Sequence, residues 1–175
     1  MFFCVTSRLG FRGHQPQDEA GFVAMHTDRE VRRFVGGSAW SLQKAQARFR
    51  EEYLAQPTET YGLWATVLRS EDTFIGSCGL RAPDGSHPPS LAFYLARPHW
   101  GRGLASEAAR CFVDLAFHRL NLRCIAAEVQ EGHRASERIL SKLGFRLVSR
   151  ENIAGASRVI CHYELRDSSR PAPLL

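Results

Sequence analysis

Lysine is almost missing from this 175-residue sequence. Of the 23 cationic side chains, only Lys44 and Lys142 are lysines and the rest are arginines, and the formal net charge is +5. The planar guanidinium of arginine suits phosphate and carboxylate ligands, so an anionic ligand is compatible with this excess. Genomic codon preference is the simpler explanation for most of it. The arginines form no long basic stretch interleaved with aromatic residues, which argues against a nucleic-acid-binding surface.

Long apolar runs and a secretion signal are also missing. The uninterrupted hydrophobic stretches are only a few residues long, far short of the roughly 20 residues that cross a bilayer. The apolar start, residues 1–5, has no basic residues before it and is followed by Thr6, Ser7 and Arg8, unlike a signal peptide. These absences predict a cytoplasmic protein with no membrane partner.

Motifs for metal binding or paired thiols are missing as well. The sequence contains five cysteines, namely Cys4, Cys78, Cys111, Cys124 and Cys161. They form no C-x-x-C pair and most have apolar neighbours, which predicts reduced, buried core residues in a reducing compartment. The seven histidines form no H-E-x-x-H pattern, so no metal site is predicted. A thiol nucleophile is not favoured, because no base accompanies a cysteine in a recognisable motif.

The sequence does contain the pattern of one mixed α/β domain. A chain of this length and 44% hydrophobic content buries roughly 70% of its unfolded surface without a disulfide or a metal. Hydrophobic periodicity and turn residues predict strands over residues 5–12, 61–68, 73–80, 91–96, 124–129, 145–149 and 158–164. They predict helices over residues 17–26, from Ser41 to Pro57, over 104–119 and over 134–143. We expect the domain to span residues 1–165 and residues 166–175 to be a flexible tail.

The apolar spacing of two expected helices defines their buried faces. After Ser41, the residues Leu42, Ala45, Phe49 and Tyr53 recur at intervals of three or four, which predicts one buried face. In the helix over residues 104–119 the corresponding residues are Leu104, Ala108, Cys111, Phe112 and Leu115. Both helices should therefore pack against a sheet.

The segment over residues 95–108 carries the clearest chemical signal. An apolar strand leads through Gly101 and Gly103 into the start of a helix, where the first backbone N–H groups have no intrahelical acceptor. The helix dipole adds about half a positive charge there, and glycine leaves room for a ligand. Arg97 and Arg102 add formal charge. These features predict a phosphate cradle, although a tight strand–helix turn without a ligand would use the same residue types.

Residues 100–105, Trp-Gly-Arg-Gly-Leu-Ala, resemble the pyrophosphate-binding motif of the GNAT acetyltransferase superfamily, Gln/Arg-x-x-Gly-x-Gly/Ala. Trp100 replaces the usual first residue of the motif. A Trp at this position resembles the branch of ribosomal-protein N-terminal (RimJ/RimL-like) acetyltransferases. Residues 6–12 resemble that branch's opening strand and residues 74–80 its Ile-Gly central strand. Residues 132–145 resemble its Asn-x-x-Ser … Lys-x-Gly-Phe segment. The resemblance covers about residues 5–165.

This resemblance implies a single GNAT-like α/β (α+β) domain. Its central mixed, mostly antiparallel sheet would have about seven strands flanked by four helices, with a splay between the fourth and fifth strands. It implies acetyl-CoA as cofactor, with pantetheine along the fourth strand, and CoA as product. A primary amine would attack the thioester directly in a ternary complex, so orientation would supply much of the acceleration. The implied cofactor-binding residues are Phe93, Tyr94, Leu95, Ala96, Arg97, Trp100, Gly101, Arg102, Gly103, Leu104, Ala105, Ser106, His133 and Ser136.

The sequence departs from the superfamily's pattern at catalytic positions. His133 replaces a cofactor-contacting Asn, with a tolerated surface substitution as the alternative. Leu140 replaces a Tyr that protonates the departing thiolate, and Ser90 replaces a Glu that relays the proton of the amine. Ser136 is then the candidate acid, with helix capping as its alternative role. Glu128 is the candidate base, with an exposed strand position or a route through water as alternatives.

The acceptor is not identified by these motifs. Residues 35–39 correspond to the superfamily's acceptor-side loop, so Phe34 and Trp40 on either side of it are candidate substrate-binding residues. The main hypothesis is an N-acetyltransferase acting on a protein N-terminus or a small-molecule amine. The absent Tyr and Glu favour, as the alternative, a non-catalytic acyl-CoA-binding or sensor module. A basic nucleic-acid-binding domain is less favoured, and a homodimer is compatible with the sequence.

Overall fold

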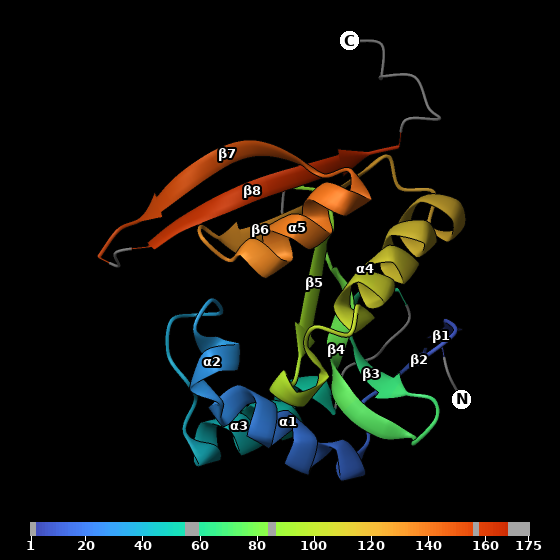
Figure 1. The fold of residues 1–175 in the computed structure, drawn as a ribbon, viewed down its shortest axis with the longest axis vertical. Helices are drawn as coiled ribbons and strands as arrows, with labels where there is room; N and C mark the ends of the chain where they lie inside the picture. Colours follow the sequence, from blue (N-terminus) through green and yellow to red (C-terminus); the bar gives the residue numbers. More distant parts are fainter. Residues whose placement is uncertain (1–2, 55–59, 84–86, 156–157, 168–175) are drawn as a thin grey trace.

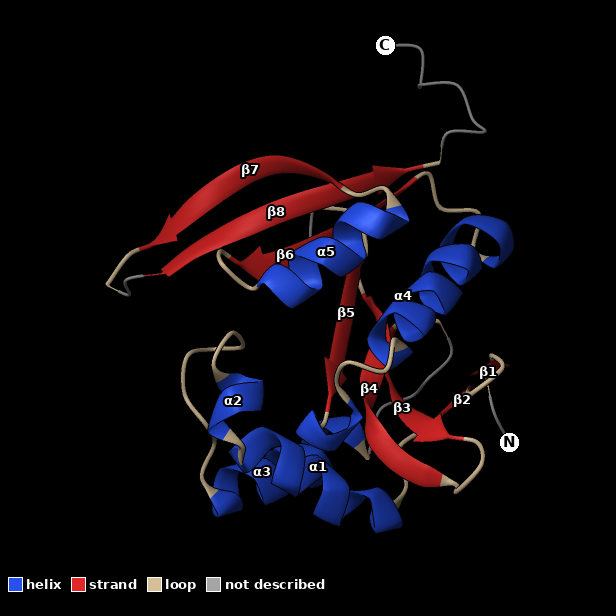
Figure 2. Ribbon diagram, viewed as in Figure 1, coloured by secondary structure: helices blue, strands red, loops and turns tan. Residues whose placement is uncertain are grey.

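The computed structural model describes residues 3–54, 60–83, 87–155 and 158–167, which form one eight-stranded sheet and five α-helices (Figures 1 and 2). The strands are β1 (Cys4–Val5), β2 (Leu9–Arg12), β3 (Gly62–Leu68), β4 (Thr73–Arg81), β5 (Ser90–Leu95), β6 (Cys124–Gln130), β7 (Arg146–Ile153) and β8 (Arg158–Arg166). The helices are α1 (Glu19–Thr27), α2 (Arg29–Arg32), α3 (Leu42–Arg48), α4 (Leu104–Asp114) and α5 (Arg134–Leu143). The strand order β1-β2-β3-β4-β5-β6-β8-β7 confirms a mixed, mostly antiparallel sheet.

The extra strand and the extra helix each have a local cause. The expected strand over residues 5–12 is an antiparallel hairpin of β1 and β2, because Thr6 Oγ1 accepts a hydrogen bond from the Leu9 amide at 3.0 Å and turns the chain. The additional helix α2 begins where Asp28 accepts a hydrogen bond from the Glu30 amide at 2.8 Å, an N-cap that stabilises its first turn.

Two expected boundaries fall at or beyond the edge of the described residues. β8 extends to Arg166, two residues beyond the expected end of the last strand, and residues 168–175 of the expected tail lie outside the described residues. The helix that begins after Ser41 continues beyond α3 as a π-helical turn, Phe49–Tyr53, and the expected stop at Pro57 lies outside the described residues.

The buried face expected for the helix after Ser41 is partly wrong. Ala45 and Phe49 are fully buried, but Leu42 is 57% exposed. Leu42 lies in the first turn of α3, where the contacts of the helix with α1 do not cover it. The expectation of buried cysteines is also only partly met: Cys78 and Cys161 are buried, whereas the other three are half-buried and all five are free thiols.

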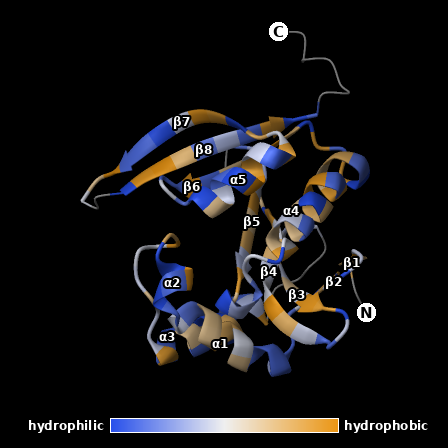
Figure 3. Cartoon of the chain, in the orientation of Figure 1, coloured by the Kyte–Doolittle hydropathy of each residue, from blue (hydrophilic) through white to orange (hydrophobic). Residues whose placement is uncertain are grey.

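Two apolar cores lie on opposite faces of the sheet. Along β5, Leu91 and Leu95 belong to the core that α4 covers, whereas Tyr94 packs against a second core built on Phe22 and Phe49. This alternation follows from the period of two in a strand. Figure 3 shows β5 coloured hydrophobic along most of its length; Leu91 and Leu95 on the α4 side are buried, and the residues on the other face are half-buried.

The sheet is almost divided between β5 and β6. These two parallel strands share one pair of partner residues, Ser90 with Ala126, whereas β6 pairs with β8 along its whole length. In Figure 1, β6, β7 and β8 form a group set apart from β5. The predicted splay is confirmed, and the edge of β5 beyond Ser90 faces a gap.

Candidate active site

A hollow of about 210 Å³ lies in the gap between the splayed strands. Phe93 and Tyr94 of β5 and Glu128 of β6 line it together with His133 and Ser136 at the start of α5. Because Phe93 and Tyr94 project from opposite faces of β5, the hollow has walls on both faces of the sheet. It therefore connects the side covered by α5 with the side that carries the second core.

The edge of β5 offers backbone groups to this hollow. The Ala96 amide donates to the Ile75 carbonyl of β4 at 2.9 Å, so the backbone groups of Ala96 point away from the gap. Since successive residues of a strand point their backbone groups to alternate edges, those of Phe93 and Leu95 face the gap. The Trp100 indole nitrogen donates to the Leu95 carbonyl at 2.8 Å, so Trp100 connects this edge to the following turn.

The predicted phosphate cradle lies after β5, at the start of α4, which has no side-chain cap. Gly101 and Gly103 have φ values of 72° and 75°, a left-handed conformation that favours glycine. Gly103 is the N-cap of α4, and among the described residues no side chain caps the first-turn amides. Gly101, Arg102 and Gly103 are exposed, as is Arg97. The amides of residues 104–106 are therefore available to an anion, which stabilises such a helix start through hydrogen bonds and the helix dipole.

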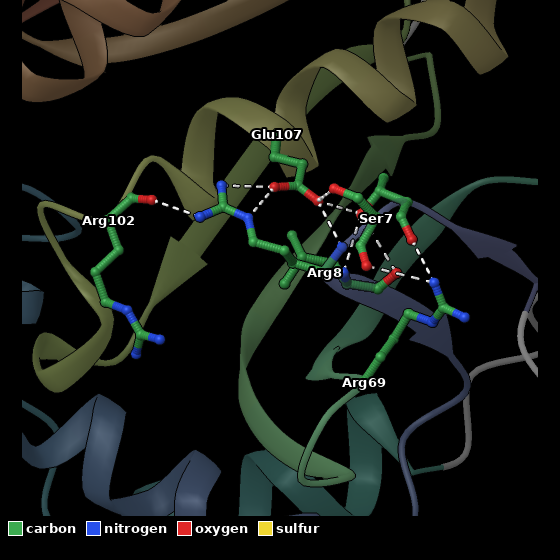
Figure 4. A network of polar contacts seen from close by, with 7 residues as sticks. Ser7, Arg8, Arg69, Arg102 and Glu107 are labelled. Carbon is green, nitrogen blue, oxygen red and sulfur yellow. Dashed lines mark hydrogen bonds and ion pairs between the residues drawn. The ribbon is translucent and has the colours of Figure 1, made fainter.

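Glu107 anchors the cradle to the turn between β1 and β2. Its role was not predicted from the sequence. Its Oε1 atom accepts from Thr6 Oγ1 at 2.5 Å, from Ser7 Oγ at 3.2 Å and from the Arg8 amide at 3.0 Å. Its Oε2 atom accepts from Arg8 Nε at 2.6 Å, and Arg8 Nη1 donates to the Arg102 carbonyl at 2.9 Å (Figure 4). The turn between β1 and β2 is thus linked to the cradle backbone.

The ionisation of Glu107 fits this role. Burial acts to raise its pKa, but hydrogen bonds from Thr6 and Arg8 outweigh burial, and the pKa is lowered. The carboxylate stays charged and holds the Arg8 guanidinium beside the cradle. Its only sequence signal was an acidic residue in the first turn of a helix.

The start of α5 is capped from within the protein. His133 is the N-cap, and its Nδ1 atom accepts from the Ser136 amide at 3.5 Å. Its ring stacks on Phe34 with centroids 4.4 Å apart. Burial lowers the pKa of His133, which keeps the imidazole neutral and able to accept. The capping role considered for Ser136 belongs to His133, and the half-buried Ser136 hydroxyl remains beside the hollow.

Glu128, the candidate base, and Leu140, which stands where the superfamily has its acidic Tyr, both line the hollow. The Glu128 side chain is 59% exposed, and its Oε1 lies 3.8 Å from His162 Nδ1. Leu140 is fully buried and also lines the hollow, so the position of the superfamily's Tyr offers no proton. Ser90 lines the hollow as well, beside the strand pair that closes its end.

The two candidate substrate-binding residues have different surroundings. Phe34 lines the hollow, whereas Trp40 packs in the second core. Its ring stacks on His26 with centroids 4.4 Å apart, and the Arg32 guanidinium carbon lies 4.4 Å from its centroid. Burial lowers the pKa of His26 to about 3, so this core is uncharged at His26. The structure places Trp40 outside the hollow between β5 and β6.

Two further expectations concern metals and membranes. The described ranges contain no group of three or more His, Cys, Asp or Glu side chains placed to hold a metal ion. None of the helices in the described part of the chain has the length and apolarity to span a membrane.

Known proteins share this architecture. Residues 8–146 match the family model described as acetyltransferase (GNAT) domain. The uncharacterised N-acetyltransferase p20 of Bacillus licheniformis is 33% identical over 143 residues, which cover 80% of each chain.

Solved structures agree in fold. A GNAT-family acetyltransferase from Bacillus anthracis superposes with a TM-score of 0.80 at 18% identity, covering 95% of this chain and 98% of that one. RimL, a ribosomal α-N-protein acetyltransferase in complex with coenzyme A, superposes with a TM-score of 0.78 at 11% identity, covering 97% of this chain and all of that one (100%). The chain belongs to the GNAT acetyltransferase family, and it is an acyltransferase.

Proposed function

We propose that the protein transfers the acetyl group of acetyl-CoA to a primary amine by direct attack in a ternary complex. The observation that carries this proposal is the uncapped start of α4 beside the gap between β5 and β6. The start of α4 suits a diphosphate, and the free edge of β5 suits an extended chain such as pantetheine. The coenzyme A bound by RimL, a protein of the same fold, supports the proposed donor.

The donor would be held chiefly by backbone groups. The amides of Leu104, Ala105 and Ser106 would bind the diphosphate, and the exposed Arg97 and Arg102 would add positive charge. The edge groups of Phe93 and Leu95 would pair with the amides of pantetheine. Acetyl-CoA, when bound, supplies an activated acetyl thioester. Fixing it against β5 leaves one reacting carbonyl in the hollow, so orientation contributes to the rate.

Proton transfers would fall to Glu128 and Ser136. An amine is protonated near neutral pH and must lose a proton before it attacks. The Glu128 carboxylate, exposed in the hollow, would accept that proton directly or through a water molecule. The Ser136 hydroxyl lines the same hollow from α5. It would pass a proton to the departing sulfur and recover one from the acetylated nitrogen, directly or through water, so that the products are the amide and the CoA thiol. A single chain supplies all these groups, so the proposal requires no homodimer.

Calorimetric titration and an acceptor screen test the proposal together. Acetyl-CoA should bind the folded protein, and free thiol should be released above background when a panel of amines, N-terminal peptides and polyamines is added. Well-folded protein that binds neither CoA nor acetyl-CoA would contradict the proposal. Binding without turnover of any amine would instead favour the acyl-CoA-binding module, which the absence of an acid at Leu140 and of a carboxylate at Ser90 also suggests.

A further inference from the structure

A second hollow adjoins the one between β5 and β6. Its walls come from β6, β7 and β8, and they include Glu151 and His162. Arg81, Ser90 and Glu128 line both hollows. The two spaces therefore meet where β4 ends and β5 begins, beside the strand pair of Ser90 that closes the splay.

The register of the strands places these three shared side chains on one face of the sheet. Arg81 lies directly opposite Ser90 in the antiparallel pair of β4 and β5. Ser90 lies opposite Ala126 in the parallel pair of β5 and β6, and Glu128 is two residues beyond Ala126. Partner residues, and residues two apart in a strand, share a face. This face is opposite the one that α4 covers. Arg81 and Glu128 are exposed on it, so an acceptor can reach them when CoA is held by α4.

The junction combines a cation and a carboxylate that the protein does not pair with each other. Arg81 Nη2 donates to the Tyr94 hydroxyl at 2.5 Å, and Arg81 forms no ion pair within the described residues. Glu128 has only His162 within ion-pair distance in that part of the chain, at 3.8 Å. Both side chains are exposed. Tyr94 thus orients a guanidinium that no carboxylate of the described residues neutralises.

Free amino acids match this pair of charges. A guanidinium binds a carboxylate through two parallel hydrogen bonds, and a carboxylate attracts an ammonium group. Resting on the proposed function, we propose that the acceptor is a free α-amino acid, with its carboxylate on Arg81 and its amine beside Glu128. Arg81 is then a specificity-determining residue, because an internal peptide bond or a simple alkylamine would leave its guanidinium unpaired.

Matched acceptors test this assignment. Free-thiol release from acetyl-CoA is measured with the free L-amino acids, with the carboxamide and methyl ester of each, and with the alkylamine that lacks the carboxylate. The free acids should have the highest kcat/KM, roughly 10- to 100-fold above the matched carboxamide, as expected for the loss of a charged hydrogen-bonded pair. The variant Arg81→Gln should abolish this preference mainly by raising KM for the free acid, and Arg81→Lys should keep part of it.

Controls separate the two proposals. Arg110→Gln, at an exposed position on α4 outside both hollows, makes the same change in charge and should keep the preference. Unchanged affinity of Arg81→Gln for acetyl-CoA shows that the variant is folded. Equal kcat/KM for acids, carboxamides and alkylamines would overturn the assignment of Arg81 and leave acetyl transfer standing. Acetyl-CoA binding without transfer to any amine would overturn both proposals.

Discussion

The N-termini of α4 and α5 are built from similar residues, but the first has no side-chain cap and the second is capped by His133. Each follows a glycine with positive φ, 75° at Gly103 and 85° at Gly132, and each has a glutamate in its first turn. The α4 start has no side-chain cap, and its Glu107 is turned towards the β1–β2 turn. At α5, His133 accepts from the first-turn amide of Ser136.

This difference shows that the N-cap side chain decides whether a helix start is available to a ligand. At α5 the Glu137 carboxylate accepts from the Gly132 amide at 3.1 Å, so donors are used internally. At α4 the equivalent carboxylate is used elsewhere and glycine cannot cap, so the donors stay free. Of these two helix starts, the one of α4 combines free donors with an adjacent open strand edge.

The largest expected effect comes from adding a side chain at Gly103, with Gly132 as the matched control position. Gly103→Glu should weaken CoA binding by 100-fold or more, on the order of 3 kcal/mol, because a carboxylate would occupy the place of the diphosphate. Gly132→Glu imposes comparable backbone strain and has open space around it, so it should change affinity only a few-fold. Calorimetric titration with CoA measures both. Equal losses would show that strain, and not the cradle, explains the first result.

The next effect concerns the carboxylate that supports the cradle. Glu107→Gln should weaken CoA binding roughly tenfold, because loss of the charge releases Arg8 from its place beside the Arg102 carbonyl. Glu137→Gln is the matched variant at α5 and should leave CoA binding almost unchanged. The ratio of the two dissociation constants is the measurement. A value near one would mean that Glu107 only anchors the hairpin.

Removing the α5 cap should affect stability more than binding. His133→Ala should lower the free energy of unfolding by about 1 kcal/mol, the usual cost of a lost N-cap, and His133→Asn should restore most of it, since Asn is a good cap. Thermal unfolding of the three proteins gives the comparison. If the Ala variant unfolds at the same temperature as the wild type, the bond from the Ser136 amide adds nothing to stability.

The smallest effect is a pH dependence confined to the α5 start. Burial lowers the pKa of His133 below the value near 6.5 of an unfolded chain. Its contribution to stability is therefore present above pH 6.5 and is lost as the pH falls from there towards the folded pKa. The wild type should lose slightly more stability than His133→Asn between pH 7 and pH 5.5. Burial also lowers the pKa values of His14 and His26. Both proteins contain these residues, so their contributions cancel in the comparison. Identical pH profiles would contradict the capping role.

The sequence was most informative where the signal is local. The strand, the glycine turn and the amphipathic helix over residues 91–119 were predicted because periodicity and turn chemistry involve near neighbours. The role of Glu107 was missed because its partner Arg8 is 99 residues away in the chain, and no local pattern states which elements meet. The exposure of Leu42 and the position of Trp40 were missed for a related reason: burial depends on what another element covers. The junction at Arg81 likewise requires the register of three strands.

The single strand pair of Ser90 and Ala126 has a consequence for stability. The strands β6, β7 and β8 with α5 form a unit continuous in sequence. Its backbone pairs with β5 at one residue pair, and its apolar side chains share the core that α4 covers. Cohesion across the splay therefore comes from side chains and not from the sheet. A ligand that pairs with the free edge of β5 would add backbone hydrogen bonds at the place where the sheet has fewest, and would raise the free energy of unfolding through binding to the folded state.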